Sequence, residues 1–81
     1  MPDADDPEYV YVLRLRDGCF YVGASRTPYA AIQDHIRGRG GAWTLRHRFL
    51  KVIVIKHASA AVTLETMLAQ YAHDYGADKV Q

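Results

Sequence analysis

The fold is decided by residues 9–23, YVYVLRLRDGCFYVG. β-branched, aromatic and aliphatic side chains fill both ends of this stretch, which is typical of strands. Asp17-Gly18 lies between the two ends and is a dipeptide typical of a type I′ turn, so the stretch predicts a β-hairpin. Tyr11 and Tyr21 then fall at similar height on neighbouring strands, where side chains of equal parity share a face. We therefore expect the two phenols to open onto one surface, although two ordinary strand aromatics would show the same pattern.

Three further elements are expected after the hairpin. Thr27 can cap a helix whose first residue is Pro28, which predicts a helix over residues 28–37, closed by a glycine. The apolar run VIVI within residues 49–56 predicts a strand that is covered on both faces and lies centrally in the sheet. A second helix over residues 59–75 begins at a capping serine and ends before a glycine. The fold class is therefore α+β: a small three-stranded, mainly antiparallel sheet packed by two helices, with room for a short third helix near the arginine-rich loop.

The length of 81 residues leaves room for one domain, which we place at residues 9–81. Residues 1–8 are rich in acidic side chains and are expected to form a tail without fixed structure. Cys19 is the single cysteine, which excludes an internal disulfide and favours an intracellular location in the cytoplasm, nucleoid or nucleus. The acidic N-terminus does not resemble a signal peptide, and no apolar run has the length of a membrane span, so neither export nor membrane insertion is expected.

The net charge of +1 conceals a basic body. Beyond the acidic tail, ten basic side chains face five acidic ones, and residues 35–51 contain basic residues but no acid. Arginine presents a planar fork to phosphate oxygens, and glycine lets backbone N–H groups approach a phosphate closely. DNA is therefore the expected partner, although a solvated basic loop without a ligand has the same composition. The candidate DNA-binding residues are Arg26, Arg37, Arg39, Gly40, Trp43, Thr44, Arg46, His47 and Arg48. Within this set, Trp43 fits a core anchor better than a platform for base stacking.

Glu65 is the most informative single carboxylate. It is the only charged residue between Ala58 and Ala72, and its neighbours at helical spacing are alanines and a leucine. An acid on an apolar face needs a partner. A Mg²⁺ ion would supply one, because Mg²⁺ takes one or two protein carboxylates together with water and phosphate oxygens. A helix carboxylate that is solvated or paired with an arginine is the alternative.

The order and spacing of these residues resemble the GIY-YIG nuclease superfamily, in particular its small single-domain members. The resemblance rests on two tyrosine tripeptides, a histidine, a glycine-arginine-glycine stretch followed by tryptophan and threonine, and a glutamate. In this chain they are Tyr9-Val10-Tyr11, Tyr21-Val22-Gly23, His35, Gly38-Arg39-Gly40, Trp43-Thr44 and Glu65. Valine replaces isoleucine in both tripeptides, and Tyr9 stands at the first glycine. The resemblance covers nearly the whole chain after the acidic tail.

The resemblance implies a metal-dependent DNA endonuclease that hydrolyses phosphodiester bonds through one Mg²⁺ or Mn²⁺ ion. Tyr11 would act as general base towards the attacking water, with a pKa lowered by a nearby cation. Tyr21 would orient that water or a phosphate oxygen. His35 would assist proton transfer or contact phosphate, and Glu65 would be the sole protein ligand of the metal.

One position departs from the family pattern. Family members place an arginine one helical turn before the histidine, where its guanidinium contacts the scissile phosphate, whereas this chain has Ala31. Losing such a donor from a preorganised site costs roughly 3–4 kcal/mol, or 10²–10³ in rate. Arg37 would lie on a different face of the helix, while Arg26 could reach from the preceding loop. The chain is therefore a naturally degenerate domain, a form inactivated by a deliberate alanine substitution, or a domain whose arginine comes from elsewhere.

Two other functions compete with the nuclease. Ala31 favours a catalytically dead nucleic-acid-binding module that keeps the fold and the basic loop. A protein-interaction domain could instead use the alanine-rich face of the second helix. A homodimer or a partner protein could supply the DNA specificity of so small a domain. The remaining histidines lack the spacing of a zinc site, so no structural metal is expected.

Overall fold

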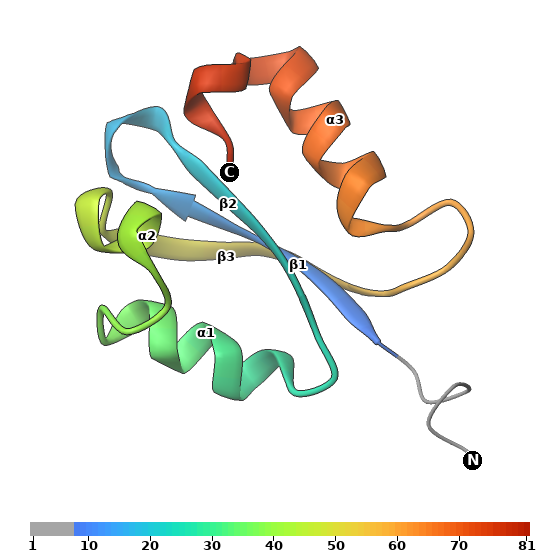
Figure 1. Cartoon of the computed structure of the whole chain (residues 1–81), viewed down its shortest axis with the longest axis horizontal. Coiled ribbons are helices and arrows are strands. Elements are labelled where there is room, and N and C mark those ends of the chain that lie inside the picture. Colours follow the sequence, from blue (N-terminus) through green and yellow to red (C-terminus); the bar gives the residue numbers. More distant parts are fainter. Residues whose placement is uncertain (1–7) are drawn as a thin grey trace.

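Residues 8–81 are described by the computed structural model of the chain, so Asp3, Asp5 and Asp6 of the expected acidic tail lie outside the described part. The fold is α+β, as predicted, with one three-stranded sheet and flanking helices (Figure 1). The strands are β1 (Tyr9–Leu15), β2 (Phe20–Ser25) and β3 (Phe49–His57). The helices are α1 (Pro28–Ile36), α2 (Ala42–Arg46) and α3 (Leu64–Tyr75), with a short turn at Arg16–Gly18 and a 3₁₀ turn at Ala77–Lys79.

β1 and β2 form the predicted antiparallel hairpin. Tyr11 lies opposite Gly23, and Tyr21 lies opposite Leu13, so the two tyrosines are diagonal neighbours on one face of the sheet. In the turn, both residues of the Asp-Gly dipeptide have the positive φ angles that a type I′ turn requires, 67° and 71°. The predicted turn is therefore present, and the strand pairing that follows it places Tyr11 and Tyr21 on the same face.

The central strand is β1, because the strand order is β2-β1-β3 and both pairings are antiparallel. The prediction that residues 49–56 form a central strand covered on both faces is therefore wrong. Val12 and Leu13 of β1 have no exposed surface, whereas Leu50 and Ile53 of β3 are 48% and 39% exposed. Both strands are rich in apolar residues, so apolar content alone does not tell the central strand from an edge strand.

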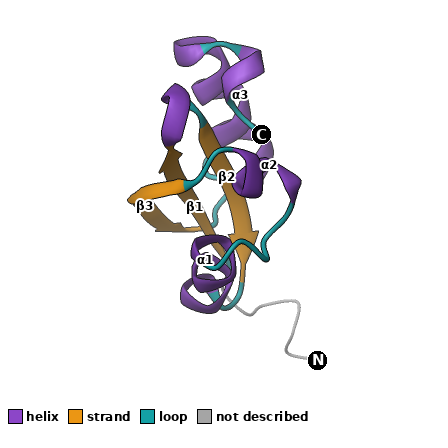
Figure 2. Ribbon diagram, turned by 90° about the vertical axis from the view of Figure 1, so that its left-hand side faces the viewer, coloured by secondary structure: helices purple, strands orange, loops and turns teal. Residues whose placement is uncertain are grey.

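Helices α1 and α3 cover opposite faces of the sheet (Figure 2). On one face, Tyr11 and Leu13 of β1 pack with Ile32 of α1. On the other face, Val10 of β1 packs with Met67 of α3. The alternation of side chains along β1 thus divides the interior into two apolar cores, one under each helix.

Helix α3 begins at Leu64, which corrects the predicted start near Ser59. Thr63 caps the helix: its hydroxyl accepts from the backbone N–H of Thr66 at 3.1 Å, and the Thr66 hydroxyl accepts from the backbone N–H of Thr63 at 2.9 Å. This reciprocal pair satisfies two N–H groups that the first turn would otherwise leave unpaired. The Ser59 hydroxyl instead accepts from the N–H of Val62 within the preceding loop.

The first helix and the short third helix agree with prediction. α1 begins at Pro28 and ends at Ile36, one residue before the predicted end. The expected cap by Thr27 is wrong, because its hydroxyl forms no capping hydrogen bond and lies instead 3.3 Å from Ser25 Oγ. α2 follows the glycine-rich loop, at the place where the sequence has room for a short helix. Within residues 8–81, no helix combines the length and the apolar character needed to cross a membrane.

Candidate active site

A buried polar cluster joins β1, α1 and α2 on the α1 face of the sheet. Tyr11 Oη lies 3.3 Å from His35 Nε2, and His35 Nδ1 lies 2.9 Å from Thr44 Oγ1. The Thr44 hydroxyl donates in turn to the carbonyl oxygen of Gly41 at 3.4 Å. The three side chains are 2%, 4% and 0% exposed, respectively, so this Tyr11–His35–Thr44 cluster is closed to solvent.

Two glycines make room for the cluster. The Tyr11 ring lies across Gly23 of β2, where a Cβ atom would overlap the Cζ and Oη atoms of the ring. The His35 ring lies against Gly40, where a Cβ atom would overlap Nδ1 and Cε1. Neither glycine has a positive φ, so the close approach of a ring, and not a turn, excludes a side chain at both positions. Gly40 is predicted to contact a DNA phosphate, but in the structure it packs against the ring of His35.

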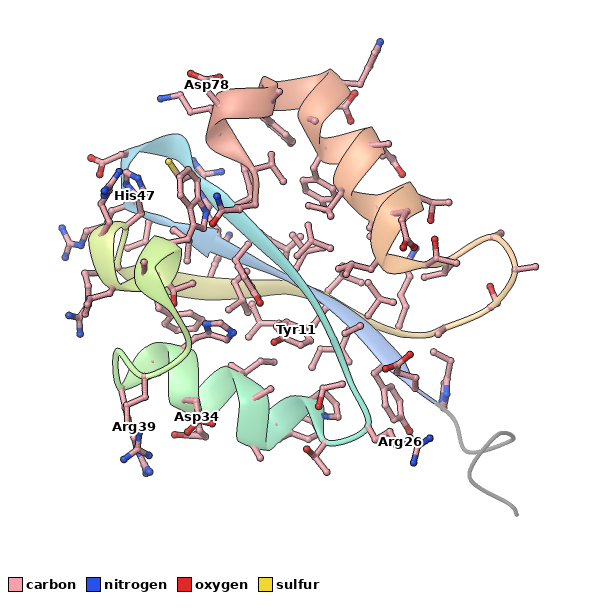
Figure 3. The ribbon with its side chains drawn as sticks, viewed as in Figure 1. Tyr11, Arg26, Asp34, Arg39, His47 and Asp78 are labelled. Atoms are coloured by element: carbon pink, nitrogen blue, oxygen red, sulfur yellow. The ribbon has the colours of Figure 1, made fainter. Side chains whose placement is uncertain are left out.

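Tyr21 lies on the open side of the cluster. Its ring centroid is 4.3 Å from that of His35 and 6.2 Å from that of Tyr11. The Tyr11 side chain points between the sheet and α1 (Figure 3). Both phenols thus lie on one face, but only Tyr21 keeps part of its surface exposed. Tyr21 is therefore the phenol that solvent or a ligand can reach.

The cluster favours the neutral forms of its groups. Burial, followed by the nearby charges of Tyr21 and Asp34, raises the pKa of Tyr11 from 10.0 to about 12. Burial also raises the pKa of Tyr21, and it lowers the pKa of His35 against an opposing effect of Asp34. The expectation of a lowered Tyr11 pKa is therefore wrong for the protein alone, because burial dominates and Ala31 brings no positive charge.

Protein stability should fall as the pH rises from 10 towards 12, because of Tyr11. The unfolded chain ionises this phenol near pH 10.0, whereas the folded protein keeps it protonated up to about pH 12. Within this window the folded state binds more protons than the unfolded state, so the free energy of unfolding decreases as the pH rises. Urea unfolding of the unaltered protein and of Tyr11→Phe, below and within the window, measures the effect. The unaltered protein should lose stability more steeply, and equal slopes would contradict the raised pKa.

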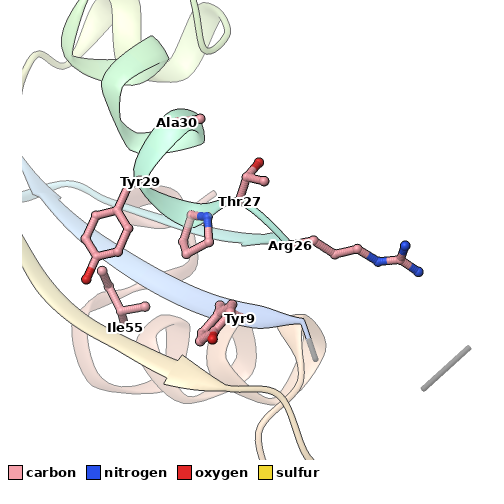
Figure 4. Close-up of a pocket in the computed structure, with 7 residues that line it drawn as sticks. Tyr9, Arg26, Thr27, Tyr29, Ala30 and Ile55 are labelled. Carbon is pink, nitrogen blue, oxygen red and sulfur yellow. The ribbon is translucent and has the colours of Figure 1, made fainter. Parts of the chain in front are cut away.

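Ala31 packs beside the cluster, at the position where the nuclease family carries arginine. It is partly buried against the apolar group that includes Tyr11 and Ile32. Arg26 does not fill this position, because its side chain extends away from α1 and lies well apart from Tyr11 (Figures 3 and 4). The structure therefore places no guanidinium of α1 or of its preceding loop next to the two phenols.

Glu65 lies in the first turn of α3, on a side of the helix that faces solvent. The buried side is formed by Met67, with Leu64, Leu68 and Tyr71 packed beside it. The apolar face predicted around Glu65 is therefore not the face that packs on the sheet, because Ala61 and Ala69, which lie at helical spacing from Glu65, are exposed. The helix dipole favours an acid in the first turn, so the position of Glu65 does not require a metal ion to explain it.

Glu65 and the tyrosines lie on opposite faces of the sheet, at the same end of the hairpin. Glu65 lines a cavity of about 400 Å³ together with Glu8, Val10 and Ala24. Val10 and Ala24 are paired across the hairpin, next to the pair of Tyr11 and its glycine partner on β2. The carboxylate and the phenol thus flank the same stretch of the edge strand β2 from opposite sides, without contact.

The donor atoms around this cavity are carboxylate oxygens. Glu8 and Glu65 both line it, and oxygen ligands are those that Mg²⁺ and Mn²⁺ prefer. Residues 8–81 contain no group of three or more histidine, cysteine, aspartate and glutamate side chains placed to hold a metal ion. The donor type therefore fits an ion that keeps water or phosphate oxygens among its ligands, as Mg²⁺ usually does.

Four arginines of the predicted DNA-binding set are exposed around α2 and the loops that flank it. They are Arg37, Arg39, Arg46 and Arg48, which we call the basic rim. Arg39 forms an exposed ion pair with Asp34 at 3.4 Å, and both residues lie at the same end of α1 (Figure 3). Among the described residues, no ion pair engages Arg37, Arg46 or Arg48. Three of the four rim arginines are therefore exposed and without an ion pair within residues 8–81.

Other members of the predicted DNA-binding set have structural roles. The indole N–H of Trp43 donates to the carbonyl oxygen of Phe20 at 2.8 Å, and the indole and the ring of His47 meet in an edge-to-face arrangement. His47 Nδ1 lies 3.1 Å from a carboxylate oxygen of Asp17. Thr44 is fully buried and offers no surface to a DNA strand. Trp43 is therefore a core anchor rather than a stacking platform.

A second cavity, of about 430 Å³, opens beside the N-terminus of α1 (Figure 4). Its walls come from β1, from β3, from the loop after β2 and from the first turn of α1: Tyr9, Arg26, Thr27, Pro28, Tyr29, Ala30 and Ile55. Tyr29 is 76% exposed, an unusual fraction for so large an aromatic side chain. The sequence carries no signal for this cavity, because its walls come from segments far apart in the chain that only the folded sheet and α1 bring together.

No protein-family model matches the chain, and no solved structure matches it significantly. A UPF0213 protein of Fusobacterium nucleatum subsp. nucleatum is 29% identical to the chain over 66 residues. The matched stretch covers 78% of this chain and 66% of the relative, slightly less than two thirds of that protein's length. The name of the relative states no activity. The chain is thus a distant relative of a UPF0213 protein.

Proposed function

We propose that the chain acts on DNA by metal-dependent hydrolysis of phosphodiester bonds, as a GIY-YIG-like endonuclease domain that lacks the family's arginine. The observation that carries the proposal is the Tyr11–His35–Thr44 cluster with Tyr21 beside it. One phenol comes from each strand of the hairpin, the histidine comes from α1, and Gly23 makes room for the first phenol. This combination agrees with the roles that the nuclease resemblance implies.

The proposed proton transfer runs from the attacking water to Tyr11 and from Tyr11 to His35. With a pKa of about 12, Tyr11 is almost entirely protonated at neutral pH, with roughly one phenolate in 10⁵ molecules. It therefore needs an acceptor for its own proton, and His35 Nε2 lies 3.3 Å away. Tyr21, which is partly exposed, would hold the water or a phosphate oxygen. Substrate binding must uncover the Tyr11 phenol, which is 2% exposed.

The carboxylate of Glu65 is the group that would hold the divalent ion, and Glu8 lines the same cavity. Bound Mg²⁺ or Mn²⁺ would neutralise charge on the phosphate and on the leaving 3′ oxygen. A phosphodiester at the Gly23-Ala24 end of the outer edge of β2 would have the phenols on one side and Glu65 on the other, because both flank this strand at neighbouring residues. Nearer the turn, the outer edge of β2 is paired with Val80 and Gln81. The Gly23-Ala24 end of this edge is therefore the proposed place of cleavage.

Plasmid nicking in the presence of Mg²⁺ or Mn²⁺ tests the proposed function. Tyr21→Phe and Glu65→Gln should each lower the nicking rate, because one loses the exposed phenol and the other the charge that holds the ion. Lys79→Ala, in the 3₁₀ turn after α3, is a control that should leave the rate unchanged. Nicking that is insensitive to both site variants would count against the assigned site.

Binding of DNA by the basic rim should depend strongly on salt. If four arginines each neutralise one phosphate, the logarithm of the binding constant should fall against the logarithm of the salt concentration with a slope of about −3.6. The double variant Arg46→Ala/Arg48→Ala should make this slope shallower by about 1.8. Fluorescence anisotropy with a labelled duplex at several salt concentrations measures it. Lys56→Ala removes a charge at the other end of β3 and should not alter the slope, whereas equal slopes for all three proteins would exclude Arg46 and Arg48 as phosphate contacts.

A nucleic-acid-binding module without cleavage is the second candidate. Ala31 favours it, and so does the lack of contact between Glu65 and the phenols. A titration with Mn²⁺ followed by NMR discriminates the two functions, because a bound paramagnetic ion broadens the amide signals of the first turn of α3. Broadening that Glu65→Gln abolishes would favour the nuclease. Salt-dependent DNA binding without any broadening would favour the module.

A further inference from the structure

Thr44 is the innermost member of the Tyr11–His35–Thr44 cluster. Its side chain has no exposed surface, and its Oγ1 atom has two partners: His35 Nδ1 at 2.9 Å and the carbonyl oxygen of Gly41 at 3.4 Å. Within residues 8–81, every buried side-chain nitrogen and oxygen has a hydrogen-bond partner. The hydrogens of the cluster must therefore be arranged so that each of its contacts joins a donor to an acceptor.

The carbonyl oxygen of Gly41 fixes this arrangement, because a carbonyl can only accept. The hydroxyl of Thr44 has one hydrogen. If it donates that hydrogen to Gly41, it can only accept from His35. A threonine in a helix commonly donates to the carbonyl three or four residues earlier, and Gly41 stands three residues before Thr44. The imidazole hydrogen then lies on Nδ1, and Nε2 is left to accept from the phenol of Tyr11.

We propose that Thr44 is a positioning residue, whose hydroxyl holds His35 in the Nδ1–H tautomer so that Nε2 can accept the proton of Tyr11. As a statement about catalysis, the proposal rests on the proposed function. The tautomer itself is a property of the folded protein, whether or not the protein cleaves DNA. In the opposite tautomer, Nε2 would carry a hydrogen and donate to Tyr11, and the phenol could not pass its proton to the ring.

The glycine-rich loop supports the same arrangement. Gly40 packs against the His35 ring, which confines the ring between the loop and the sheet. Gly41 has a φ of 138°, in the region that favours glycine, and its carbonyl oxygen accepts the hydrogen bond from Thr44 that ends the row of hydrogen bonds. Gly40 and Thr44 are predicted DNA contacts. In the structure they instead position the ring of His35 inside the protein, together with Gly41.

The test is the tautomeric state of His35, read by ¹⁵N NMR through the couplings of the ring nitrogens to the ring hydrogens. The unaltered protein should show Nδ1 protonated and Nε2 unprotonated. Thr44→Val keeps the shape of the side chain but removes the acceptor, so the hydrogen should move to Nε2 and the Nδ1–H form should be lost. Thr44→Ser restores the hydroxyl and should restore the Nδ1–H form. Circular dichroism identifies the variants that fold.

Tyr11→Phe is the matched control, because it removes the other partner of the ring and leaves Thr44 in place. If Thr44 sets the tautomer, Nδ1 stays protonated in this variant. An Nε2–H form in the unaltered protein would overturn the proposal, as would an unchanged tautomer in folded Thr44→Val or a switch in Tyr11→Phe. If Thr44→Val does not fold, the unaltered protein and Tyr11→Phe decide by themselves. None of these readings depends on cleavage, so failure of the nuclease activity and failure of this proposal are separate results.

Discussion

Replacing Ala31 by arginine is expected to raise the rate of DNA cleavage by about 10²–10³-fold, which corresponds to roughly 3–4 kcal/mol of transition-state stabilisation. Residue 31 packs against the group that contains Tyr11, so a longer side chain from this position starts beside the two phenols. Its guanidinium would meet the phosphate as negative charge builds up during the displacement. A positive charge at this place would also lower the pKa of Tyr11, against the effect of burial.

The matched control for Ala31→Arg is Ala30→Arg. The two positions are neighbours in α1, but Ala30 is exposed and lines the cavity at the start of the helix instead of the cluster. Both variants add the same charge, and both should strengthen nonspecific DNA binding. Only the change at residue 31 should accelerate nicking. Equal acceleration by the two variants would show a general effect of charge, and no acceleration by either would favour the binding module.

Asp34 is a competitor for the introduced arginine. It lies three residues after position 31, a spacing at which opposite charges on a helix pair, and it already pairs with Arg39. The double variant Ala31→Arg/Asp34→Asn removes this competition and should be at least as fast as the single variant. The comparison shows whether the guanidinium is present but held away from the phosphate.

Gly23→Ala is expected to lower the free energy of unfolding by about 1–3 kcal/mol. A Cβ atom at this position would overlap Cζ and Oη of Tyr11, and the ring cannot simply move aside because it is buried and hydrogen-bonded to His35. For a domain of this size such a loss is a large part of the total stability. Urea unfolding monitored by circular dichroism measures the effect.

A double-mutant cycle with Tyr11→Leu assigns the cause. Leucine ends before the atoms that the new Cβ would meet, so Gly23→Ala should cost much less in the Tyr11→Leu background than in the unaltered protein. Equal costs in the two backgrounds would mean that residue 23 is glycine for a reason other than the tyrosine ring. The cycle therefore tests the packing that joins the two tyrosine tripeptides.

Local rules of the sequence predict most of the architecture. The hairpin follows from the Asp-Gly turn between two apolar stretches, and the start of α1 follows from Pro28 at its first position, without the expected cap by Thr27. The strand order does not follow, because the apolar runs of β1 and β3 look alike until the pairing is known. The start of α3 is missed because both Ser59 and Thr63 can cap a helix, and only Thr63 forms the reciprocal pair with Thr66.

The candidate site is predictable in part. The parity of Tyr11 and Tyr21 places both phenols on one face, and the position of His35 in the helix places its ring between them and the loop. Burial is the property that the sequence does not reveal. It turns Thr44 from an expected DNA contact into a partner of His35, and it raises the pKa of Tyr11 where a lowered one was expected. Glu65 lies on the opposite face of the sheet from the two phenols because of the side of the sheet on which α3 packs. The apolar pattern of the helix does not determine that side.

The central place of β1 has a consequence for the folding pathway. Its first partner, β2, follows directly after a tight turn, so this pair can form on a timescale of roughly 1–10 μs. Its second partner, β3, arrives only after two helices have been made, and non-local pairing of this kind slows folding. Until β3 docks, the apolar edge of β1 is open to other chains. The chain is therefore most exposed to aggregation before β3 has paired with β1.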